Sequence, residues 1–161
     1  MLDSTLSPRA APAGTGPTYR VVDDLVTFKA TAATTNGAYG LFETRTPPGK
    51  GAPPHRQRYE EEAFWVLEGT YQFVLDDQRL DLGPGSFVFV PRGTVHAFTN
   101  SGRTPARMLI LVSPGGIHER FFAEVGEPAD GQHTPLGALP DLGRLVAVAA
   151  KYGIEMLPPQ A

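Results

Sequence analysis

Short stretches in which apolar residues cluster or alternate with polar ones recur from Tyr19 to Ser113. The stretches are YRVVDDLVTFKA, AYGLFETRT, EAFWVLEG, TYQFVLD, QRLDL, SFVFV, VHAFTN and ARMLILVS. Turn-forming sequences such as NG, PPGKG, EGT, DDQ, GPG, PRG and NSGRTP separate them, so each stretch predicts one or more β-strands. Many short strands at this spacing favour an all-β sandwich or closed barrel.

The pattern changes after Ser113 to apolar residues at helical spacing. The segments IHERFFAEVG and DLGRLVAVAAKYG, the second with Leu142, Leu145, Val146 and Ala149 in register, predict two C-terminal helices packed outside the barrel. The predicted strands EAFWVL and SFVFV are apolar on both faces. We therefore expect their outer face to be covered, either by these helices or by a second subunit.

The domain organisation follows from the same pattern. Residues 1–18 carry three prolines among small residues, a composition that buries little apolar surface and predicts a flexible N-terminal arm. Residues 19–113 form the predicted barrel, and residues 114–161 form a C-terminal helical extension. A chain of 161 residues is long enough for one such domain with a substantial core.

Composition narrows the chemistry and the partners. A net charge of -3 with 41% apolar residues gives no reason to expect nucleic acid or a membrane surface as a partner, which leaves small molecules and proteins. The chain has no cysteine, so any metal ion must be held by nitrogen and oxygen donors. There is no secretory leader pattern or long apolar run, and we expect a cytoplasmic protein.

Two segments place polar residues at positions that point inward. Residues i and i+2 of a strand share a face, so His55 and Gln57 project together, and His96 shares its face with Phe98. Glu62 opens the next predicted strand and shares its inward face with Phe64 and Val66. Polar groups that meet among apolar side chains need a partner, which suggests a metal ion.

The segments GKGAPPHRQRYEEEAFWVLEG (49–69) and GSFVFVPRGTVHAFTN (85–100) resemble the two sequence motifs of the cupin superfamily. The second fits the motif at every defined position. The first departs from it only at Gln57, where the motif has a histidine. The tail, with SPGGIHERFF and DLGRLVAVAAKYGIEML, is similar to that of small single-domain cupins described as quercetin dioxygenase-like.

The resemblance implies a jelly-roll barrel, commonly dimeric, with one metal ion held by three histidines and one glutamate. Those positions fall on His55, Gln57, Glu62 and His96. The resemblance implies one divalent ion, either Fe, Mn, Ni, Cu or Zn, and the weaker amide donor of Gln57 favours manganese or iron. Alternatively, Gln57 turns the site into a hydrogen-bonding pocket without metal.

The favoured function is a metal-dependent dioxygenase that acts on an oxygen-rich small molecule. Glu62 is then both a ligand and the catalytic proton acceptor, with Phe64, Val66 and Phe98 lining the substrate pocket. Two alternatives stay open, a non-catalytic module that binds a small ligand and a metal-dependent isomerase of a sugar or keto acid. His118 and His133 match no motif spacing and are left out of the predicted site.

Overall fold

A computed structural model describes residues 6–130 and 141–158. The larger of its two sheets contains β1 (Thr18–Val21), β2 (Asp24–Ala30), β3 (Gly40–Thr46), β5 (Glu61–Glu68), β8 (Phe87–Val90), β10 (Ala106–Ser113) and β11 (Glu127–Pro128). The smaller contains β4 (Gly51–Gln57), β6 (Tyr71–Leu75), β7 (Gln78–Leu82), β9 (His96–Asn100) and β12 (Ile154–Met156). Three helices complete the described elements, α1 (Ala32–Thr35), α2 (Ile117–Val125) and α3 (Leu142–Lys151).

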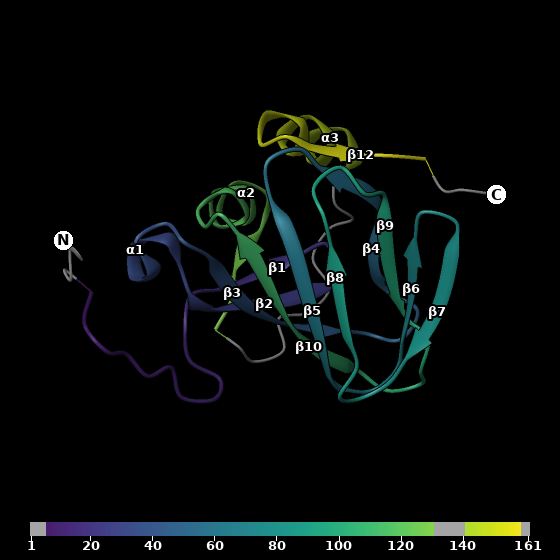
Figure 1. The fold of residues 1–161 in the computed structure, drawn as a ribbon, viewed down its shortest axis with the longest axis horizontal. Helices are drawn as coiled ribbons and strands as arrows, with labels where there is room; N and C mark the ends of the chain where they lie inside the picture. Colours follow the sequence, from purple (N-terminus) through teal and green to yellow (C-terminus); the bar gives the residue numbers. More distant parts are fainter. Residues whose placement is uncertain (1–5, 131–140, 159–161) are drawn as a thin grey trace.

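The two sheets form the predicted jelly-roll sandwich (Figure 1). Their strand orders are β11-β1-β2-β3-β10-β5-β8 and β12-β4-β9-β6-β7, and every strand pairing is antiparallel. Consecutive strands such as β3, β4 and β5 alternate between the sheets. Residues from the two motif segments therefore face one another across the interior.

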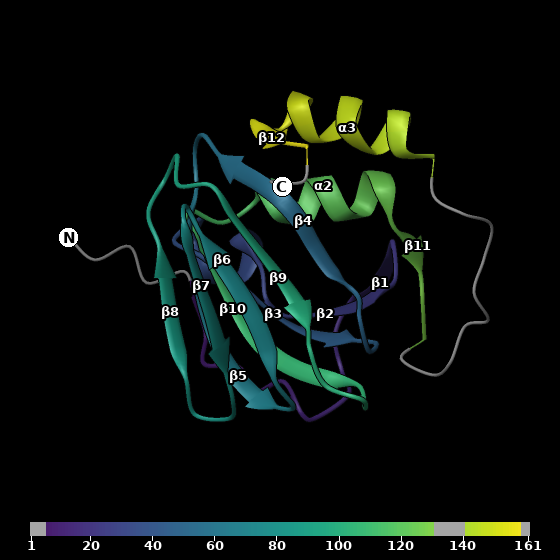
Figure 2. The ribbon, with the colours of Figure 1, turned by 90° about the vertical axis from the view of Figure 1, so that its right-hand side faces the viewer.

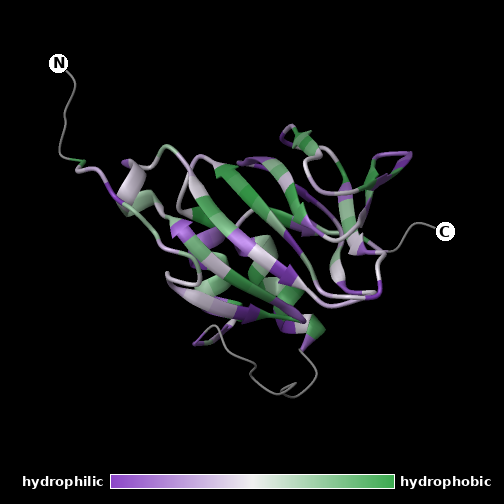
Figure 3. Ribbon diagram, turned by 90° about the horizontal axis from the view of Figure 1, so that it is seen from below, coloured by the Kyte–Doolittle hydropathy of each residue, from purple (hydrophilic) through white to green (hydrophobic). Residues whose placement is uncertain are grey.

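The core lies between the sheets and follows the period of two along the strands. In β10 every second residue is buried, starting at Ala106, and Phe64 and Val66 on β5 are each 1% exposed. Figure 3 shows this alternation as apolar and polar colours that change along the strands. Each such aromatic or branched side chain contributes about 1.5–3 kcal/mol when fully buried, so register decides which residues stabilise the fold.

Helices α2 and α3 confirm the two predicted C-terminal helices. Both lie at one end of the sandwich, with α2 between α3 and the strands (Figure 2). The ring of Phe122 on α2 lies 5.4 Å from that of Phe42 and 6.1 Å from that of Phe28. Helix α2 therefore contributes to the core itself, and the extension also supplies two strands, β11 beside β1 and β12 beside β4.

The outer face of β5 and β8 is not covered by any described part of the chain. Trp65, Phe87 and Phe89 are 54%, 62% and 52% exposed. Trp65 and Phe87 are direct partners in the ladder, so the exposed rings are neighbours. The expectation that the C-terminal helices cover this face is wrong, because the apolar stripe of α2 packs on the core at the end of the sandwich.

The turns behave as their sequences predict. Gly69 has a φ of 79°, and a Cβ there would lie 2.6 Å from that of Ala106, so only glycine fits. The Asn100 amide donates to the carbonyls of Thr46 and Thr104 at 2.9 and 2.8 Å and accepts from the backbone N–H of Gly102. These bonds hold the chain where β9 ends. Residues 6–17 are exposed along their whole length.

Candidate metal centre

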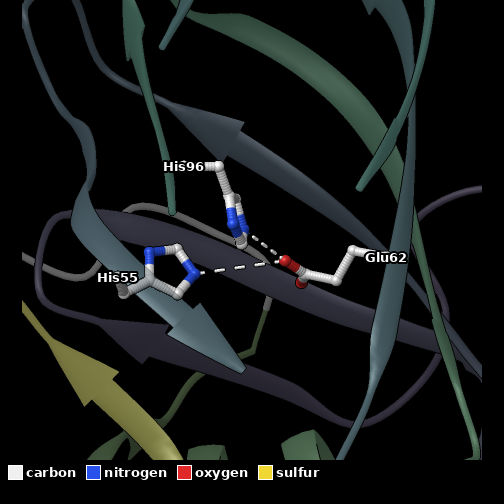
Figure 4. Close-up of side chains that lie close together, drawn as sticks. All are labelled: His55, Glu62 and His96. Atoms are coloured by element: carbon white, nitrogen blue, oxygen red, sulfur yellow. Dashed lines mark hydrogen bonds and ion pairs between the residues drawn. The ribbon is translucent and has the colours of Figure 1, made fainter. Parts of the chain in front are cut away.

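His55, His96 and Glu62 converge from both sheets on one buried point (Figure 4). His55 on β4 and His96 on β9 are paired in register, and their ring centroids are 4.2 Å apart. Glu62 faces them from β5 in the other sheet. The three side chains are between 1% and 8% exposed, and their donor atoms all lie within 4.8 Å of one another.

The hydrogen bonds of both imidazoles orient their second nitrogens toward Glu62. His55 Nδ1 lies 2.8 Å from the carbonyl oxygen of Pro53, and His96 Nδ1 lies 3.0 Å from that of Thr94. A carbonyl oxygen only accepts, so each Nδ1 carries a proton. The Nε2 atoms of His96 and His55 then lie 2.7 and 4.0 Å from Glu62 Oε2, which is the arrangement of imidazoles prepared to bind a cation.

The pKa values of Glu62 and His55 favour the states that bind metal. Burial raises the pKa of Glu62, but the hydrogen bond with His96 and the surrounding imidazoles outweigh it and hold the pKa at about 2. Burial, followed by the neighbouring His96, lowers the pKa of His55 to about 4. Near neutral pH, therefore, Glu62 is ionised and His55 is neutral.

The contact between His96 and Glu62 tests whether this set of residues fits a metal ion. Burial lowers the pKa of His96, yet the bond and the charge of Glu62 raise it above its ordinary value. A proton on Nε2 therefore joins the two groups at 2.7 Å when no other cation does. A divalent ion can take the place of that proton, and imidazole nitrogens with a carboxylate oxygen are donors that iron, manganese, nickel, copper and zinc accept.

Gln57 is buried, at 3% exposure. It lies beside a residue that is not in the predicted set. Its Nε2 lies 3.4 Å from Nε2 of His118, at the start of α2. The His118 side chain is 5% exposed, and its Nε2 lies 3.6 Å from Glu62 Oε1. His118, which was left out of the predicted site, therefore lies next to the predicted residues and lines a cavity beside them.

A sequence signal for His118 exists, although it is weak. His118 shares a helix face with Phe121 and Phe122, three and four residues later, so an inward Phe pair predicts an inward histidine. His133 lies outside the described residues.

A cavity of about 110 Å³ adjoins the cluster. His55, Glu62, His118 and Phe98 are among the residues that line it. Of the three predicted pocket residues only Phe98, at 5% exposure, lines the cavity, whereas Phe64 and Val66 are each 1% exposed and do not. Two further lining residues, Asp24 and Thr44, have buried side-chain oxygens without a hydrogen-bond partner, which adds polar groups to those of His55, Glu62 and His118 in a largely apolar cavity.

The cupin domain family matches residues 42–112 of the chain. Quercetin 2,3-dioxygenase of Bacillus subtilis is 30% identical over 128 residues, covering 80% of this chain and 37% of that protein. The chain spans 37% to 63% of the length of the curated relatives that it matches.

Solved structures show the same fold. A predicted oxalate decarboxylase from Thermotoga maritima has a TM-score of 0.60 at 18% identity, covering 66% of this chain and 99% of that one. An RmlC-like cupin from Shewanella frigidimarina has a TM-score of 0.59 at 16% identity, covering 68% and 93%. None of the helices among the described residues is long and apolar enough to cross a membrane.

Proposed function

Because residues 42–112 form a cupin domain, we propose that this chain is a metal-dependent enzyme, an oxygenase acting on an oxygen-rich small molecule. The observation that carries the proposal is the convergence of His55, His96 and the ionised Glu62 beside a partly apolar cavity. The Bacillus subtilis relative, named quercetin 2,3-dioxygenase, supports this reaction class. In the proposal these three residues hold one divalent ion, with Gln57 beside them.

The chain's own residues have separate roles in this proposal. When bound, the ion supplies a Lewis acid that polarises vicinal oxygen atoms of a substrate. Glu62 is the catalytic carboxylate, because its ionised oxygens accept a proton from a substrate hydroxyl. Phe98 shields the cavity from water, whereas Gln57 does not line the cavity and acts through its contact with His118.

The size of the cavity indicates the size of the substrate. Its volume of about 110 Å³ is smaller than the roughly 150 Å³ cavities that hold one benzene ring. A compact enediol or keto acid therefore fits better than a three-ring flavonol, which needs the wall formed by α2 to open. Asp24 and Thr44, with their unpartnered oxygens, supply additional hydrogen-bond partners to hydroxyl groups of such a substrate.

Elemental analysis followed by oxygen uptake tests the proposal. Protein purified without added metal or chelator is expected to contain one first-row metal ion per chain. It is then screened with flavonols and with smaller enediols and keto acids. Glu62→Ala is expected to lose oxygen uptake, whereas Glu61→Ala, which changes the neighbouring carboxylate on the same strand, is expected to keep it. Metal-loaded protein that consumes no oxygen with any of these compounds would contradict the proposal.

The two alternatives differ in what they predict for the same screen. A binding module, favoured by the neutral amide at Gln57, shows a higher melting temperature with ligand but no product. A metal-dependent isomerase stays active in strictly anaerobic buffer. Oxygen-dependent turnover that is lost in Glu62→Ala contradicts both alternatives.

We also propose that the chain forms a homodimer through the outer face of β5 and β8. The exposed rings of Trp65, Phe87 and Phe89 lie at an edge of the larger sheet, where an exposed apolar patch favours association with a second copy. Light scattering of the eluted protein is expected to give twice the chain mass, and the mass of one chain for Trp65→Lys. A monomeric wild type would contradict this proposal.

A further inference from the structure

Three imidazoles, not two, surround the carboxylate of Glu62. His55 and His96 face its Oε2 at 4.0 and 2.7 Å, and His118 faces its Oε1 at 3.6 Å. Each of these rings approaches through Nε2, and each has its Nδ1 bonded to an oxygen. The third ring comes from helix α2, which lies outside the segment matched by the cupin family.

We propose that His118 is a metal ligand that replaces the imidazole missing at Gln57. The proposal rests on the proposed metal centre and extends it. Two donors that share one ion at about 2.1 Å each lie no more than about 4.2 Å apart. The Nε2 atoms of His96 and His55 meet that limit at Oε2 of Glu62, at 2.7 and 4.0 Å, and the Nε2 atom of His118 meets it at Oε1, at 3.6 Å. His118 lies outside the set whose donor atoms are all within 4.8 Å of one another, so in this proposal the His118 ring and the Glu62 carboxylate close on the ion when it binds. His118 thus restores a set of three histidines and one glutamate.

Glu60 holds the His118 ring in the orientation that this role needs. Its Oε2 lies 2.7 Å from His118 Nδ1, and its Oε1 accepts the backbone N–H of His118 at 3.3 Å. The Glu60 side chain is only 1% exposed, so both partners are desolvated. A carboxylate on the outer nitrogen of a ligating histidine fixes the ring and makes it a better donor.

The surroundings of Gln57 explain how His118 can take the place of a histidine at position 57. Nε2 of the Gln57 amide lies 3.4 Å from Nε2 of His118, so the two side chains lie on the same side of the cluster. His118 also stacks on Phe42 at 5.8 Å between ring centroids. The ring is therefore held by packing on one side and by Glu60 at its outer nitrogen, and its remaining nitrogen faces Glu62.

Counting the imidazoles bound to copper tests the assignment without measuring activity. Pulsed electron paramagnetic resonance of the Cu(II)-loaded full-length chain is expected to show three coupled imidazoles in the wild type and two in His118→Gln. Copper affinity is expected to fall by more than the roughly 10- to 100-fold typical of a lost outer partner. Glu60→Gln keeps all three imidazoles and binds within that range. Glu119→Gln, one residue along α2, is the control and behaves as wild type.

The possible outcomes separate this proposal from the metal centre itself. Two imidazoles in both wild type and His118→Gln, with metal still bound, would overturn the role of His118 and leave the metal centre standing. If copper binds neither the wild type nor His118→Gln, both the role of His118 and the metal centre are overturned. If His118→Gln does not fold, as judged by circular dichroism, the wild type is compared with His96→Ala instead. Three coupled imidazoles in the wild type and two in His96→Ala support the proposal. Two in the wild type and one in His96→Ala contradict it.

Discussion

The candidate metal centre has two halves that are positioned in different ways. His55, His96 and Glu62 sit on strands, where the ladder register sets their places. His118 sits on α2 and is held by Glu60 and by the packing of Phe121 and Phe122 against the core. Strand register thus places residues through backbone hydrogen bonds, whereas the position of a residue on a helix depends on how well the helix packs.

The three histidines around Glu62 also differ in charge. Burial and the neighbouring His96 keep His55 neutral, with a pKa of about 4. Burial lowers the pKa of His118 as well, but the charge and hydrogen bond of Glu60 raise it above its ordinary value. The strand half therefore offers one neutral imidazole near neutral pH, that of His55, whereas the raised pKa values of His96 and His118 favour a proton that a metal ion must displace.

Removing the strand half is expected to have the largest effect. His96→Ala deletes a donor that is in direct contact with Glu62, and we expect metal affinity to fall by more than about 100-fold. Equilibrium dialysis followed by elemental analysis measures the loss. His118→Gln is the matched comparison and is expected to lose less. A greater loss in His118→Gln would reverse the order of the two halves.

Loosening the helix half is expected to reduce stability. Phe122 on α2 is 8% exposed and packs against Phe28 and Phe42, so Phe122→Ala should destabilise the protein by about 3–5 kcal/mol. Urea denaturation measures the change. Leu142→Ala truncates an apolar side chain on α3 that is 65% exposed and should change stability by less than about 0.5 kcal/mol. Equal losses would mean that α2 is not anchored through Phe122.

Asp24, which lines the cavity, gives a pH-dependent prediction. Burial outweighs an opposing hydrogen bond with Thr46 and, with the neighbouring charge of Asp23, raises the pKa of Asp24 from 3.8 to about 7. A carboxyl whose pKa is higher when folded loses stability as pH rises from about 4 to about 7. Asp24→Asn should therefore add up to about 4 kcal/mol above pH 7 and nothing near pH 3. Thermal unfolding across this range checks it, and a gain that is independent of pH would contradict it.

Restoring the motif histidine is expected to have the smallest effect. Gln57→His should change metal affinity by less than about tenfold, because His118 already occupies that side of Glu62. The same change made in the His118→Gln protein should recover most of the lost affinity. Titration with a metal-binding dye measures both. A large gain in Gln57→His alone would show that position 57 lacks a donor that His118 does not replace.

Much of the site could be predicted because strands carry their information locally. A period of two orients His55, Gln57, Glu62 and Phe98 inward wherever the strand forms, and all four are buried. The same rule predicts that Phe64 and Val66 face inward, but not how deep they lie. Their depth depends on the opposite sheet, and the cavity reaches Phe98 but not Phe64 or Val66.

The sequence by itself therefore determined the sandwich, the two C-terminal helices and the motif side chains that point into it. Only the tertiary structure decided that α2 turns His118 toward Glu62, that Glu60 is buried behind it, and that Trp65 stays exposed. The physical reason is the range of the forces involved. Side-chain alternation is set by each strand's own backbone, whereas the docking of a helix depends on contacts between residues far apart in the chain.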